Sequence, residues 1–206
     1  MVTPRRIGLD LDNTVIDYAP AYRSVAREMG LPPELVDRES IRESLRKSEE
    51  DDEEWQRFQA HLYTDGLAYA KPAPGLLEFL RLCDSTGVSV VIISHKTETT
   101  PARFGSRDLR APAFEWLDIQ GIVPTHVSPD GVFFCINRVE KVRTIAATQC
   151  AVFVDDLTEV LNDPGMPSSI LRFRYVTGTN AIFDLPDNIV DADFFALTRW
   201  LSMPDT

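Results

Sequence analysis

The residues best suited to chemistry lie near the start of the sequence, in the stretch GLDLDNT. Asp10 and Asp12 follow a short apolar run and are separated by one residue. Two carboxylates this close repel each other, and burying either one costs free energy unless a positive charge compensates it. The spacing is compatible with a polar turn after a strand, but it also fits a site that holds a cation.

Two later apolar runs also end in polar groups. The run VSVVIIS ends at Ser94, and CAVFVDD ends at Asp155 and Asp156. A helical segment between them carries Lys141 near its N-terminal end. Ligands bind beyond the carboxyl ends of parallel strands, so we expect these side chains at one sheet edge together with Asp10.

This set of side chains predicts a magnesium and phosphate site. The carboxylates of Asp10 and Asp155 are hard oxygen ligands of the kind that Mg²⁺ takes together with waters and substrate phosphate. The Ser94 hydroxyl and the Lys141 ammonium are suited to phosphate oxygens. A carboxylate nucleophile beside a metal and a fixed ammonium is the arrangement for an aspartyl-phosphate intermediate, so we expect phosphoryl chemistry with Mg²⁺ as the cofactor.

A calcium-binding loop is an alternative interpretation of the D-x-D-N start. Such a loop needs an acid eleven residues after Asp10, where Ala21 stands, and a helix rather than a strand leading into it. The sequence therefore argues against an EF-hand.

The motifs DLDNT, IISHK, Lys141 and VFVDDL occur in the order of the four motifs of the haloacid dehalogenase-like (HAD) superfamily, which the sequence resembles over about residues 6–160. The resemblance implies that Asp10 is the nucleophile. It also implies that Asp12 protonates the leaving oxygen and then activates water. An alkoxide leaving group needs a proton and a halide does not, so Asp12 favours phosphoryl transfer over dehalogenation.

The same resemblance implies the ligands of the site. It places Mg²⁺ on Asp10, the main-chain carbonyl of Asp12, and Asp155, and it leaves open whether Asp156 also contacts the metal. Ser94 and Lys141 would bind the transferring phosphoryl group. The substrate-binding set that we predict is Asp10, Asn13, Ser94, His95 and Lys141.

Three functions remain open at this point. The first is a phosphatase that hydrolyses a small phosphate monoester. A phosphosugar mutase would share every motif and differ in how long the phospho-aspartate survives. A non-catalytic binding module of the same fold is the third, although it would be expected to have lost at least one of the acids.

The elements that must position these residues alternate along the chain. Near-continuous apolar runs at 88–94 and 150–156 are typical of strands buried on both faces. Helical spacing at 74–87, 108–121 and 138–149 separates the strands. The alternation predicts a Rossmann-like α/β fold with a parallel sheet sandwiched by helices, of the HAD-like type.

One segment interrupts the alternation. Residues 18–71 are helical in composition and far longer than a strand-to-helix connection needs. We expect a small helical cap at 18–71, inserted into an α/β core made of 1–17 and 72–206. Trp55 and Phe58 are predicted to lie on the apolar face of a cap helix.

Composition restricts the partners. The net charge is −11, which argues against a nucleic-acid-binding surface. The acidic run EEDDEE at 49–54 is typical of a solvated face. No run approaches the length of a membrane span, and no apolar leader precedes Asp10. We expect a cytoplasmic protein acting on a small phosphorylated molecule, with no prediction of oligomeric state.

The three cysteines, Cys83, Cys135 and Cys150, lie far apart in apolar contexts and predict buried, reduced thiols.

Several other polar residues allow more than one interpretation. His95 could face the substrate or only stack at a strand end. Lys96 could add a second phosphate contact, but a solvated lysine is the favoured interpretation. The segment 97–110 could be a mobile loop that brings Arg103 or Arg107 to the site, or a lead-in to the next helix. His61 and His126 lack partners at metal-ligand spacing and are expected to be structural.

Overall fold

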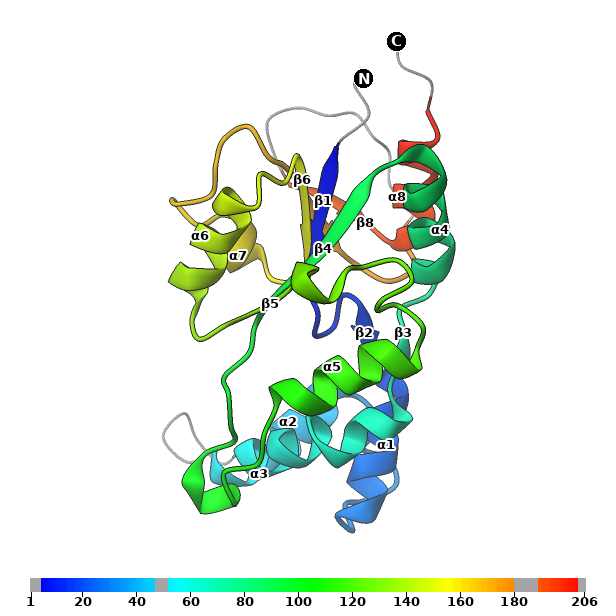
Figure 1. Cartoon of the computed structure of the whole chain (residues 1–206). Coiled ribbons are helices and arrows are strands. Elements are labelled where there is room, and N and C mark those ends of the chain that lie inside the picture. Colours follow the sequence, from blue (N-terminus) through cyan, green and yellow to red (C-terminus); the bar gives the residue numbers. More distant parts are fainter. Residues whose placement is uncertain (1–4, 47–51, 180–188, 204–206) are drawn as a thin grey trace. The chain divides into compact units, whose positions relative to one another are not determined.

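The computed structural model describes residues 5–46, 52–179 and 189–203, and its ribbon is shown in Figure 1. The chain forms two compact units, each built from separate stretches of sequence. The sheet unit comprises residues 1–16, 72–96 and 120–206, and the helical unit comprises 17–71 and 97–119. Over the described ranges, every helix is too short or too polar to cross a membrane.

The sheet unit is built on six parallel strands in the order β5-β4-β1-β6-β7-β8. β1 spans Arg6–Leu9 and lies between two other buried strands, β4 (Ser89–His95) and β6 (Val152–Asp155). The remaining strands are β5 (Val132–Cys135), β7 (Leu171–Tyr175) and β8 (Val190–Ala192). The predicted α/β class with a parallel sheet is therefore confirmed.

Helices cover both faces of this sheet, as Figure 1 shows. On one face lie α6 (Arg138–Ala147) and the short α7 (Thr158–Leu161), and on the other lie α4 (Leu76–Thr86) and α8 (Phe194–Leu201). A single 3₁₀ turn, η3 (Pro129–Gly131), leads into β5.

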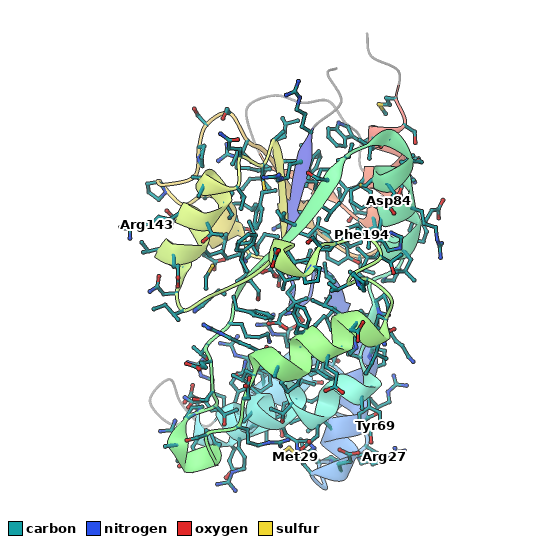
Figure 2. All side chains as sticks on the ribbon, viewed as in Figure 1. Arg27, Met29, Tyr69, Asp84, Arg143 and Phe194 are labelled. Atoms are coloured by element: carbon teal, nitrogen blue, oxygen red, sulfur yellow. The ribbon has the colours of Figure 1, made fainter. Side chains whose placement is uncertain are left out.

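Aromatic and aliphatic side chains fill the two layers between the sheet and its helices. Phe194, labelled in Figure 2, lies with its ring centroid 5.4 Å from that of Phe79 on α4 and 5.2 Å from that of Tyr175 on β7. On the α6 face, Ile93, Ile145 and Phe153 belong to one buried cluster. The predicted burial of the central strands on both faces follows from these two layers.

Gly8 allows β1 and its neighbours to approach closely. A Cβ atom at this position would lie 2.6 Å from the Phe153 ring and 2.9 Å from the Cys150 sulfur, well inside van der Waals contact. The three cysteines are buried and form no disulfide among the described residues, as the sequence predicts.

The helical unit contains α1 (Ala19–Glu28), α2 (Arg38–Leu45), α3 (Glu53–Leu62) and α5 (Arg110–Ile119). The described part of this unit also contains two 3₁₀ segments, η1 (Asp65–Tyr69) and η2 (Ala102–Phe104). Its core is aromatic. The fully buried Phe58 stacks on Tyr22 and on Trp55, with ring centroids 6.1 Å and 5.7 Å apart. The predicted apolar face of Trp55 and Phe58 is confirmed.

The boundary of the core differs from the sequence-based prediction at one segment. Residues 97–119, predicted to belong to the core, group with the helical unit. Arg107 forms a bidentate ion pair with Asp65, and the Arg103 side chain donates a hydrogen bond to the Gln56 side-chain oxygen. These partners lie more than forty residues away in sequence, so the local helical pattern of α5 could not reveal them.

Two other elements mark the chain positions where one unit gives way to the other. β2 (Ile16–Asp17) and β3 (Lys71–Pro72) form a separate two-stranded sheet.

The acidic run at 49–54 is described only in part, because residues 49–51 lie outside the described ranges. Glu53 and Glu54 form the first turn of α3, where negative charge is favourable to the helix dipole.

Candidate active site

The site lies at the carboxyl edge of the sheet, where the chain order reverses. The chain leaves β1 towards β4 and leaves β6 towards β7, so the switch point of the fold lies between the carboxyl ends of β1 and β6. Leu9 pairs with Val154, which places Asp10 and Asp155 at the same level on adjacent strands. The Asp10 N–H donates to the Val154 carbonyl at 2.8 Å and fixes the backbone there.

Lys141 reaches both of these carboxylates from α6. Its Nζ donates to Asp10 Oδ1 in a short hydrogen bond and to Asp155 Oδ2 at 2.7 Å. All three side chains are buried, with exposed fractions of 2% for Lys141, 7% for Asp10 and 0% for Asp155. Charge-assisted hydrogen bonds between buried groups such as these are strong and directional.

The start of α6 sets the position of Lys141. Asn137 caps the helix, its side chain accepting from the Glu140 N–H at 2.8 Å. The Glu140 carboxylate in turn accepts from the Ile136 N–H at 2.6 Å. These two hydrogen bonds stabilise the first turn of α6. The Lys141 N–H then donates to the Asn137 carbonyl at 3.1 Å, so the lysine side chain begins one turn into the helix.

Burial dominates the electrostatics of this cluster. It raises the pKa of Asp10 well above its ordinary value, against the attraction of Lys141, and Asp155 and Asp156 raise it further. The pKa of Asp155 is raised for the same first reason. Burial opposes the charge on Lys141, but Asp10 and Asp155 more than offset it and raise the lysine pKa. One ammonium balances only one of the two carboxylates that it contacts, so the pair keeps an excess of negative charge.

A divalent cation fits this charge excess. Asp10, Asp155 and Asp156 each offer a carboxylate oxygen, and these oxygens lie within 4.8 Å of one another. Asp155 is further oriented by the Leu157 N–H, which donates to its Oδ1 at 2.9 Å. A hard cation such as Mg²⁺ takes oxygen ligands of this kind and offsets their repulsion. The side chain of Asp12 is outside this cluster, and its main-chain carbonyl as a ligand stays a prediction.

Two buried hydroxyls that belong to the DLDNT and IISHK motifs lack hydrogen-bond partners among the described residues. Ser94 Oγ and Thr14 Oγ1 are inaccessible to solvent and make no hydrogen bond to the described protein atoms. Buried polar atoms are nearly always satisfied, so an orphan hydroxyl at a site is available to a ligand. Ser94 lies near the end of β4, next to β1, where the sequence predicts a phosphate-binding hydroxyl.

A tight turn follows Asp12. Val15 and Ile16 both donate their N–H groups to the Leu11 carbonyl, at 3.0 Å and 2.8 Å. Asn13 has a φ of 62° within this turn, a left-handed conformation that asparagine adopts more readily than most residues. The half-buried Asn13 stays a predicted substrate ligand.

Comparison with known proteins bears on the fold. No protein-family model matches the sequence, and no curated protein matches it significantly. Protein Tyrosine Kinase A (PtkA) from Mycobacterium tuberculosis is similar in structure, with a TM-score of 0.62, 18% identity, and coverage of 98% of this chain and 100% of that chain. A putative phosphatase from Clostridium difficile has a TM-score of 0.59 and 12% identity, covering 96% and 98% of the two chains.

A haloacid dehalogenase-like family hydrolase from Streptococcus pneumoniae has a TM-score of 0.54 and 16% identity, covering 85% of this chain and 86% of that chain. A haloacid dehalogenase-like hydrolase from Bacteroides fragilis is also similar, at a TM-score of 0.53. The chain has the haloacid dehalogenase-like fold. The fold predicted from the four motifs is therefore confirmed. At these identities the likeness concerns the fold, which hosts more than one chemistry.

Within the haloacid dehalogenase-like core, Lys96 departs from expectation. We expected a solvated lysine, but its side chain is only 3% exposed and pairs with Asp12, with Nζ 2.8 Å from Oδ2 and 3.1 Å from Oδ1. The physical reason lies in the strand geometry. Ser94 and Lys96 are two residues apart in an extended segment, so both side chains leave it on the same side. The two-residue spacing from Ser94 is the feature of the sequence that could have predicted a buried Lys96.

The remaining polar candidates are His95, Arg103 and Arg107. His95, between Ser94 and Lys96, is exposed, and its contact with substrate stays a prediction. Arg103 and Arg107 are held within the helical unit by Gln56 and Asp65.

The two remaining histidines contact carboxylates. His61 lies 3.1 Å from Glu28 and 3.3 Å from Asp65, and His126 lies 2.5 Å from Asp84. These contacts agree with the structural roles expected for both residues.

Proposed function

We propose that this protein is a Mg²⁺-dependent phosphatase that hydrolyses a small-molecule phosphate monoester through a phosphorylated Asp10. The observation that carries the proposal is the buried Lys141, which donates to both Asp10 and Asp155 at the switch point of the sheet. A buried ammonium shared by two acids is costly for stability, and such perturbed groups cluster at functional sites.

The proposed reaction has two steps. In the first, a carboxylate oxygen of Asp10 attacks phosphorus, the bond to the ester oxygen breaks, and Asp12 gives its proton to that leaving oxygen. In the second, Asp12 takes a proton from water, whose oxygen attacks the phosphorus of phospho-Asp10. Inorganic phosphate is released and Asp10 is restored.

The surrounding residues bind and orient the phosphoryl group. The Lys141 ammonium offsets charge on its oxygens, and the Ser94 hydroxyl, which has no partner among the described residues, donates to one of them. Asp10 and Asp155, with Asp156 close by, would hold Mg²⁺. The metal would supply Lewis-acid stabilisation of the phosphoryl oxygens when bound.

Several similar structures support this class of reaction, and one of them raises an alternative. They include a predicted phosphoglycolate phosphatase from Haemophilus somnus and a HAD family hydrolase from Deinococcus radiodurans with bound phosphate and sodium. PtkA, in contrast, is named as a protein tyrosine kinase. Transfer to a hydroxyl, as in a kinase or a phosphosugar mutase, is therefore the second candidate. A non-catalytic binding module is disfavoured because Asp10, Asp12 and Asp155 are all present.

We further propose that the helical unit is the cap of this core and selects the substrate, since the chain enters it directly after the turn that follows Asp12. The buried reduced cysteines agree with a cytoplasmic location.

The direct test is a panel of phosphate monoesters, including phosphotyrosine, assayed for phosphate release with Mg²⁺ and with excess chelator. We expect turnover that needs Mg²⁺ and falls at least about a thousandfold in Asp10→Asn. Asp130→Asn, at an exposed position in η3, is the matched control and should keep full activity. Full activity of Asp10→Asn would exclude the nucleophile. Phosphate found on a second hydroxyl rather than in solution would favour phosphotransfer.

A further inference from the structure

Lys96 is a second buried lysine at the edge of the sheet, and the reaction described above does not use it. Its backbone is fixed by the Lys96 N–H, which donates to the Cys135 carbonyl at 2.9 Å and extends the pairing of β4 with β5. Its side chain ends at Asp12, with Nζ 2.8 Å from Oδ2 and 3.1 Å from Oδ1. A lysine is almost never this buried unless it is paired, so the contact with Asp12 accounts for its position.

The two buried lysines donate hydrogen bonds to different carboxylates. Lys141 donates to Asp10 and Asp155, whereas Lys96 donates to Asp12. An ammonium that contacts both oxygens of one carboxylate restricts its rotation about the Cβ–Cγ bond. A proton donor is effective only when it lies within hydrogen-bond reach of the leaving oxygen, so the orientation of Asp12 matters for its proposed role.

We propose that Lys96 is a positioning residue that holds the Asp12 carboxylate in the orientation needed to protonate the leaving oxygen. The proposal rests on the function proposed above. It deepens that function by assigning a separate lysine to the proton-transfer residue, beside the lysine that serves the nucleophile. Lys96 acts through Asp12 and not through contact with the substrate.

A positioning role predicts a dependence on the leaving group that a general loss of structure would not produce. In phenyl, 4-chlorophenyl and 4-nitrophenyl phosphate the leaving oxygen becomes progressively less basic, so it needs the proton progressively less. In Lys96→Met we expect kcat/KM for phenyl phosphate to fall about tenfold more than for 4-nitrophenyl phosphate, with KM little changed. Lys71→Met, at an exposed lysine, is the matched control and should lower neither.

A double-mutant cycle shows whether Lys96 acts through Asp12. In the Asp12→Asn background, Lys96→Met should cause no further loss for phenyl phosphate, because the orientation of an absent carboxylate has no effect. A full further loss in that background would overturn the proposal, since Lys96 would then contact the substrate directly. Equal losses for all three esters would also overturn it.

The same cycle measured on stability separates this proposal from the proposed function. Urea unfolding of the two single variants and the double variant should be non-additive by about tenfold in the unfolding equilibrium constant, as for residues in direct contact. Lys96→Gln replaces Lys96→Met if the latter does not fold. Additive effects would overturn the pairing itself. Coupled stability with no wild-type turnover of any ester would instead overturn the proposed phosphatase, and the positioning role with it.

Discussion

Two groups of charged side chains in this protein have similar members but opposite surroundings. In the sheet unit, Lys141 lies between Asp10 and Asp155, and all three are buried. In the helical unit, Arg107 pairs with Asp65 through two hydrogen bonds of 2.6 Å, yet these side chains are 44% and 53% exposed. The favourable geometry of the exposed pair says little about its energy, because water screens it.

The exposed group continues along the surface of the helical unit. His61 lies between Glu28 and Asp65, and Tyr69, labelled in Figure 2, donates to Glu28. These contacts lower the pKa of Glu28, chiefly through the hydrogen bond from Tyr69. Burial in the sheet unit shifts the carboxyl pKa values upward instead. Hydrogen bonding thus lowers the pKa of an exposed carboxyl group, whereas burial raises the pKa of the carboxyl groups in the sheet unit.

The largest difference between the two groups should appear when one cation is removed. Lys141→Met leaves Asp10 and Asp155 buried without their ammonium, so we expect a loss of about 3–5 kcal/mol in the free energy of unfolding. The proposed phosphatase activity should be abolished as well. Urea denaturation and phosphate release measure the two effects. A loss below about 1 kcal/mol would show that the cluster is better solvated than its burial indicates.

Mg²⁺ should stabilise the buried group and leave the exposed one unaffected. At a Mg²⁺ concentration one hundred times the dissociation constant, the free energy of unfolding should rise by about 2.7 kcal/mol. The effect should be much smaller in Asp155→Asn and unchanged in Asp65→Asn, the exposed control. Equal Mg²⁺ stabilisation of all three proteins would place the binding site elsewhere.

The two groups should respond to pH with opposite signs. Because the pKa of Asp10 is raised, the folded state binds more protons, and stability is lost as pH rises from about 4 through that raised pKa. The pKa of Glu28 is lowered, so its contribution is present above about 4 and is lost as pH falls through the lowered value.

Unfolding in urea across this pH range, without metal, tests both signs. Asp10→Asn should flatten the decline on the alkaline side, and Glu28→Gln should flatten the decline on the acid side. The same slope change in both variants would contradict the assignment.

The smallest effect is expected at the exposed ion pair. Arg107→Ala should cost less than about 1 kcal/mol in the free energy of unfolding, and the cost should shrink further in high salt. The loss in Lys141→Met should change little with salt, because buried charges are weakly screened. A cost above about 2 kcal/mol for Arg107→Ala would mean that this pair is essential to join residues 97–119 to the rest of the helical unit.

Much of the sheet unit could be predicted from local patterns. The strands β1, β4 and β6 are apolar runs that end in Asp10, Ser94 and Asp155, and parallel strands bring such ends to one edge. The strands β5 and β8, of four and three residues, were not predicted. Runs this short carry too few residues for a periodic pattern, and only their pairing with β4 and β7 makes them strands.

The amino-acid sequence by itself determined which side chains are available for chemistry and on which strands and helices they lie. The tertiary structure decided which cation serves which acid. Lys141 is 131 residues from Asp10, and Lys96 is 84 residues from Asp12, so neither pairing exists along the chain. Whether a lysine is solvated or buried depends on the elements packed around it. The sequence therefore predicted a solvated Lys96, whereas the structure buries it beside Asp12, the proposed proton donor.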